Sequence, residues 1–107
     1  MTRIIAGTKT DFPIDPAIMA LLADQGSVEL QRDAAGKVHH FHTHPVDEIL
    51  MIITGALKFE WDGGERICGA GDTILLPAGT RHQSEALNEA IYVIATHPPA
   101  GDGFLGQ

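Results

Sequence analysis

From Ser27 onward, apolar and polar residues alternate in short segments separated by turn residues. Alternation with a period of two, in runs rich in β-branched and aromatic residues, is typical of β-strands with one buried face. In the run 56–61, three large apolar residues alternate with Lys58 and Glu60, so one face should point inward. We predict strands near residues 27–32, 37–44, 48–54, 56–61, 65–68, 73–76, 81–86 and 90–96.

The segments between these strands are too short to hold a crossover helix. They are rich in glycine, and the pair Asp62-Gly63 is a strong signal for a β-hairpin. The strands should therefore run antiparallel, in a sandwich or a closed barrel, and the fold class is all-β.

The residues before Ser27 have a different pattern. A short strand can pass through Ile4 and Ile5, and a short helix should follow, with Asp15 as its N-cap and Pro16 at its first position. Residues 17–23 favour that helix. We expect three parts: a strand and helix extension at 1–26 that packs on the barrel or on a partner subunit, the barrel at 27–98, and a C-terminal tail at 99–107.

Composition and charge exclude several classes of protein. The chain has 107 residues and a formal net charge of −7, and its few basic residues form no cluster, which argues against binding to nucleic acid or to anionic membranes. Its longest apolar run, 49–53, is far too short to span a bilayer, and the N-terminus lacks a signal-peptide pattern. With Cys68 as the only cysteine, we expect a soluble cytoplasmic protein.

The strand at 48–54 is apolar on both faces. If Glu48 points inward, Leu50 and Ile52 point inward as well, whereas the residues between them face outward and need cover. That cover can come from the N-terminal segment or from a second subunit. We favour a homodimer.

Chemistry concentrates in the segment His39-His40-Phe41-His42-Thr43-His44. On a strand, His40, His42 and His44 share one face, so neighbouring imidazoles can reach a common ion. Glu48 can return a carboxylate from the adjacent strand, and His82 arrives from a distant one. Three nitrogens and one oxygen suit a borderline divalent metal ion. We interpret His39 and His97 as ordinary surface or core residues.

Glycines and a proline surround these candidate ligands at fixed spacings. The first block contains Gly36, His42, His44, Glu48 and Gly55, and the second contains Gly71, Pro77, Gly79 and His82. Both blocks resemble the two signature motifs of the cupin superfamily. The first matches at every specified position, and the second departs only at Ala86, where the family often has asparagine.

The resemblance covers about residues 27–98 and implies a small single-domain cupin, a jelly-roll barrel of the double-stranded β-helix type. It implies that His42, His44, Glu48 and His82 hold one divalent metal ion: iron, manganese, nickel, zinc, cobalt or copper. The presence of Glu48 argues against the three-histidine site of thiol dioxygenases. The sequence does not select one metal, because this ligand set is permissive.

An apolar pocket should surround the ion. His40 and Tyr92 are candidates for supporting roles next to the ligands, although either can be an ordinary strand residue. Asp47 and Arg81 should point away to the surface, and Cys68 should be inert packing. The expected pocket residues are Val38, Leu50, Ile52, Leu57, Phe59, Trp61 and Ser84.

Three functions remain open at this point. The first is a metal-dependent enzyme on a small organic molecule, with a dioxygenase or other oxidoreductase as the leading subclass. The second is a metal-dependent isomerase or lyase, and the third is a non-catalytic small-molecule binding protein. Few positive charges fall on inward positions, so an apolar or aromatic substrate fits better than a phosphosugar.

Overall fold

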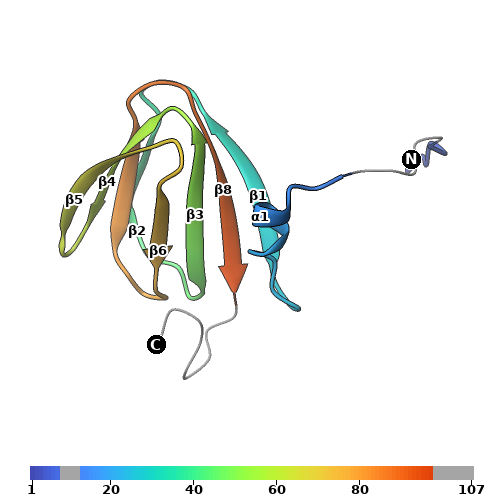
Figure 1. The fold of residues 1–107 in the computed structure, drawn as a ribbon, viewed down its shortest axis with the longest axis horizontal. Helices are drawn as coiled ribbons and strands as arrows, with labels where there is room; N and C mark the ends of the chain where they lie inside the picture. Colours follow the sequence, from blue (N-terminus) through green and yellow to red (C-terminus); the bar gives the residue numbers. More distant parts are fainter. Residues whose placement is uncertain (8–12, 98–107) are drawn as a thin grey trace.

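The computed structural model describes residues 1–7 and 13–97, and this part of the chain forms two antiparallel sheets that face each other (Figure 1). Within it, no helix is long and apolar enough to cross a lipid bilayer. The elements are α1 (Pro16–Met19), β1 (Ser27–Asp33), β2 (Val38–His42), β3 (Asp47–Thr54), β4 (Ala56–Trp61), β5 (Gly64–Gly69), β6 (Thr73–Leu76), β7 (His82–Ala86) and β8 (Ala90–His97).

The chain passes back and forth between the two sheets. The first sheet has the strand order β1-β8-β3-β6, and the second has the order β2-β7-β4-β5. All of their strand pairs are antiparallel. The predicted all-β antiparallel barrel is therefore confirmed, and the strand bounds agree with the predicted ones to within a few residues.

Apolar side chains from both sheets meet between them. Leu50 and Ile52 of β3 are 7% and 1% exposed, and Leu57 and Phe59 of β4 are 0% and 3% exposed. These belong to one core cluster that also includes Cys68, Leu76, Ala86, Ala90 and Tyr92. Leu50, Phe59 and Tyr92 of this cluster also border the polar site described below.

The N-terminal region differs from its prediction. Asp15 caps α1 as expected, because its Oδ1 accepts a hydrogen bond of 2.8 Å from the Ala17 amide, but the helix stops at Met19. No strand passes through Ile4 and Ile5, which are 91% and 76% exposed and pair with no neighbouring strand. The predicted tail at 99–107 lies outside the described residues.

Residues 14–22 lie beside the outer face of β1 and β8 (Figure 1). Ile14, Ile18, Met19 and Leu22 line a hollow there together with outward-facing apolar residues of the first sheet, Val28, Leu30 and Val93. The apolar positions of β1 therefore face away from the barrel interior. Its polar positions face inward, toward the site described below.

Gly55 allows the tight reversal between β3 and β4. Its φ of 82° lies in the left-handed region, which favours glycine. A Cβ at this position would collide with the backbone oxygen of Glu89. The corner is closed by the Asn88 side chain, whose oxygen accepts a hydrogen bond of 2.7 Å from the Ala56 amide.

Candidate metal centre

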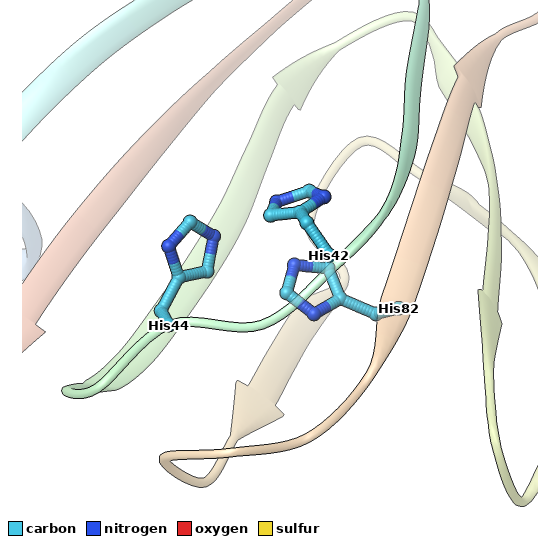
Figure 2. Close-up of side chains that lie close together, drawn as sticks. All are labelled: His42, His44 and His82. Carbon is cyan, nitrogen blue, oxygen red and sulfur yellow. The ribbon is translucent and has the colours of Figure 1, made fainter.

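Three histidines from separate parts of the chain converge on one site (Figure 2). His42 ends β2, His44 lies in the loop that follows, and His82 begins β7. Each offers a ring nitrogen, and these nitrogens lie within 4.8 Å of one another. The ring centroids of His42 lie 4.6 Å from His44 and 4.4 Å from His82. This triad can hold a metal ion.

Backbone carbonyls fix the orientation of two of these rings. The Nδ1 atom of His82 lies 2.8 Å from the Thr80 oxygen, and the Nδ1 atom of His42 contacts the His40 oxygen. A carbonyl only accepts hydrogen bonds, so each Nδ1 must carry the proton and each Nε2 keeps a free lone pair. Imidazole ligands in metal sites are oriented by the same kind of contact.

Burial favours the neutral, metal-binding form of His44 and His82. The pKa of His44 is lowered from its ordinary value by burial and by the nearby His42. Burial also lowers the pKa of His82, and its two histidine neighbours add to the effect, which outweighs the opposing hydrogen bond to Thr80. Both rings are therefore neutral near pH 7, as a ligand must be.

Glu48 lies next to the triad. Its Oε1 is 3.4 Å from Nε2 of His44, and the residue is 8% exposed. Burial raises the pKa of Glu48, although His82 and His42 act in the opposite direction. No lysine or arginine of the described residues lines the cavity beside this buried carboxylate, so none is placed to neutralise its charge. A bound cation would do so.

The triad and Glu48 form part of the wall of a cavity of about 200 Å³. Leu50, Phe59 and Ser84, three of the expected pocket residues, also line this cavity, and so does Tyr92, a candidate for a supporting role. Among the described residues, no lysine or arginine lines it. The remaining lining residues were not predicted: Glu29, Gln31, His39 and Ile94.

His39 and His40 exchange their predicted positions. The pairing of β2 with β7 shifts between His39 and His42, because a β-bulge inserts an extra residue there. His39 lies opposite Ser84 and lines the cavity, whereas His40 is exposed. The prediction that His40 shares a face with His42 was wrong, since simple alternation does not allow for the bulge.

His39 belongs to a hydrogen-bonded network centred on Asp33, which is only 2% exposed. The Oδ2 atom of Asp33 lies 3.0 Å from Nε2 of His39 and accepts a 2.7 Å hydrogen bond from the Tyr92 hydroxyl. Its Oδ1 accepts one of 2.9 Å from the Gln31 amide. Burial and then Asp33 raise the pKa of Tyr92, so this phenol stays protonated.

Several other predicted site residues lie outside the cavity. Val38 pairs with Glu85, on the opposite face of β2 from His39, so it was wrongly placed in the pocket. Ile52 and Leu57 lie in the core cluster and do not line this cavity. Trp61 is 37% exposed and lines a different cavity, together with Phe59. The Phe59 ring also stacks on His82, at a centroid distance of 5.6 Å.

Three residues were expected to have no role at the site. Arg81 is exposed and stacks over the Phe41 ring at 4.0 Å, in agreement with a surface position. Cys68 is buried, and burial raises the pKa of its thiol, which agrees with inert packing. Asp47 is not a surface group: it is 7% exposed, and its Oδ1 accepts a 2.8 Å hydrogen bond from the Ala78 amide.

Comparisons with known proteins agree with this geometry. The family model described as a cupin domain matches residues 29–95. The structure of KdgF from Halomonas sp. is 24% identical, with a TM-score of 0.67 over 76% of this chain and 77% of that one. No curated protein matches the sequence.

Two enzymes of known class also resemble the chain over part of their length. The DMSP lyase DddQ from Ruegeria pomeroyi is 26% identical, with a TM-score of 0.65 over 70% of this chain but only 39% of the lyase. The oxalate decarboxylase of Bacillus subtilis, a protein with Mn(II) centres, is 22% identical, with a TM-score of 0.61 over 66% of this chain and 20% of the decarboxylase. The latter likeness shows the shared fold alone.

Proposed function

Because the chain belongs to the cupin family, we propose that it is a metal-dependent enzyme acting on a small organic molecule bound in the barrel. The observation that carries this proposal is the convergence of three imidazoles in a cavity that also contains His39 held by Asp33.

The donor set fits one divalent transition metal ion. His42, His44 and His82 would supply three nitrogens and Glu48 one oxygen, a set that suits iron, manganese, nickel, zinc, cobalt and copper. Such an ion would supply Lewis-acid or redox chemistry next to the bound molecule. Phe59, stacked on His82, would restrict the orientation of that ring.

His39 is the group of this chain that we assign to proton exchange with the bound molecule. Asp33 lies against Nε2 of His39, so the carboxylate favours a proton on that nitrogen and leaves Nδ1 as the acceptor. Gln31 and Tyr92 hold the carboxylate in place. A histidine oriented by a buried carboxylate can act as a general base or acid.

This proton-exchanging pair favours a lyase or isomerase, because both kinds of enzyme remove a proton from carbon or oxygen without net redox change. The similarity to a DMSP lyase supports this choice. An oxidoreductase such as a dioxygenase uses the same ligand set and is our second candidate. A non-catalytic binding protein would need the cavity but not the pair.

The cavity wall also limits the substrate. It has no lysine or arginine, and it includes two acidic residues, Glu29 and Glu48. A phosphorylated substrate would lack a cationic partner there. We therefore propose a small, non-phosphorylated organic molecule of the size that about 200 Å³ can hold.

Elemental analysis of tag-free protein, with His42→Ala beside it, tests the proposal first. Near-stoichiometric metal in the wild type and its loss in the variant are expected. Iron, copper or nickel would direct the activity screen to oxygen consumption, zinc to lyase and isomerase assays, and manganese to both. If neither protein holds metal after reconstitution, the enzyme proposal fails and the binding-protein alternative takes its place.

Glu48→Gln should lower the affinity for the metal ion by about tenfold, because the amide oxygen can still approach the ion but carries no charge. This loss is smaller than the loss expected when a histidine ligand is removed. The substitution should also change the activity of the loaded protein. Metal titration followed by isothermal calorimetry measures the affinity. If affinity and activity both equal those of the wild type, Glu48 is not a ligand.

We also propose that the protein is a homodimer. On the outer face of the first sheet, Ile53 is 40% exposed and Leu30 is 71% exposed, and Ile4 and Ile5 of the N-terminal segment add two more exposed isoleucines. A second copy that packs on these side chains would bury apolar surface that is exposed in the single chain. Light scattering at micromolar concentration should give twice the chain mass of 11.4 kDa. A monomeric mass would contradict this assignment.

A cytoplasmic location completes the proposal. The only cysteine, Cys68, is free and buried, as is common in a reducing compartment.

A further inference from the structure

A second and larger cavity, of about 400 Å³, lies where the two sheets part. Its walls come from β4 and β5 of the second sheet and from β6 of the first. β5 and β6 are both edge strands, each paired on one side only, and they lie on the same side of the barrel (Figure 1). We call this cavity the seam cavity.

The seam cavity is separate from the metal centre. None of the three histidines lines it, and Phe59 is the only residue that lines both cavities. Much of its wall is apolar: Phe59 and Trp61 lie 6.1 Å apart between ring centroids, and Ile74 and Leu76 face them from β6. An aromatic or aliphatic group therefore fits between these side chains.

One cation lies in this apolar wall. Arg66 pairs directly with Phe59 across β4 and β5, so both side chains lie on the inward face of the second sheet. Among the described residues that line the seam cavity, the cavity at the metal centre and the hollow beside β1, Arg66 is the only lysine or arginine.

Arg66 also lacks a carboxylate partner within the described part of the chain. Arg32, Lys58 and Arg81 each have a carboxylate oxygen within 4.0 Å, and Arg66 does not. Asp72 lines the same cavity, but its Oδ2 accepts a 2.8 Å hydrogen bond from the Gly69 amide. That bond holds the carboxylate against its own turn.

We propose that the seam cavity binds a small organic acid with an apolar body. The guanidinium of Arg66 would take the carboxylate, since its planar fork matches the two oxygens of such a group. The apolar body would lie between Trp61 and Ile74, where it would displace water from apolar surface. The proposal does not depend on the metal centre, because no residue of the triad contributes to it.

The test compares 3-phenylpropionate with its uncharged analogue 3-phenyl-1-propanol. Each is titrated into the full chain, both as purified and after removal of metal by a chelator, and amide shifts are followed by NMR. We expect the acid to bind in both forms and to shift the amides of β5 and β6. Arg66→Gln should weaken its binding at least about tenfold. The control Arg32→Gln, which makes the same charge change on β1, should leave it unaltered.

Other results would overturn the proposal. Equal binding of the alcohol and the acid would show that the cavity is merely apolar. Unchanged affinity in Arg66→Gln would remove Arg66 from the site, as would the absence of any shift in β5 and β6. If binding requires metal and disappears in His82→Ala, the acid binds at the metal centre instead. None of these outcomes affects the metal content on which the proposed function depends.

Discussion

Replacing His82 by alanine should abolish metal binding while leaving the barrel folded. His82 is 5% exposed, and its ring centroid lies 4.4 Å from that of His42 and 5.2 Å from that of His44. Loss of a residue that only orients a ligand costs 10- to 100-fold in affinity. Loss of the ligand itself should therefore cost more than about 100-fold. Metal titration monitored by calorimetry gives the affinities, and circular dichroism verifies the fold.

The matched control is His40→Ala. It removes an imidazole from the same histidine-rich region, but His40 is exposed and lies outside the cavity. Its metal affinity should equal that of the wild type. If His82→Ala retains one ion per chain at wild-type affinity, the triad is not the metal site. If His40→Ala loses the ion as well, His40 contributes to the metal site, and the bulge in β2 does not turn its side chain away from that of His42.

The bulge in β2 marks the limit of what the sequence could predict. Alternation predicted the strands, and the turn glycines predicted their ends, because both depend on neighbours along the chain. The exchange of His39 with His40 depends on how β2 pairs with β7, about 40 residues away. No local pattern in the segment distinguishes these two histidines.

The polar face of β1 shows a second limit. Val28 and Leu30 alternate with Glu29 and Gln31, and apolar residues of a strand normally face the core. In this strand they face outward, toward residues 14–22, and the polar residues face the metal centre. The motif spacing located the triad, whereas Asp33, Gln31 and His39 carry no such spacing and were missed; of this network only Tyr92 was named as a candidate.

Asp33→Ala should destabilise the protein by about 3 kcal/mol, since removing one member of a buried, charged network leaves the others unpaired. Gln31, His39 and Tyr92 would each lose a partner in or beside the cavity. For a domain of this size the melting temperature should fall by roughly 12–24 °C. Tyr92→Phe removes a single hydrogen bond and should cost about 1 kcal/mol. Thermal and urea denaturation measure both. A loss below about 0.5 kcal/mol in Asp33→Ala would show that the network does not stabilise the fold.

The charge of Asp33 makes the unfolding free energy depend on pH, and a comparison with Asp33→Asn measures this contribution. Burial raises the pKa of this carboxyl, but hydrogen bonds from Gln31, Tyr92 and His39 outweigh burial, and the pKa lies below its ordinary value of 3.8. A lowered pKa in the folded state contributes stability that is fully present above pH 3.8 and is lost as the pH falls through the folded value. The unfolding free energy of the wild type should thus exceed that of Asp33→Asn by an amount to which the titration of Asp33 adds no change between pH 5 and 7. Below pH 4 this difference should shrink, because Asp33 becomes protonated. A difference that grows on acidification would mean that Asp33 is protonated in the folded protein, and His39 would then lack the anion that orients it.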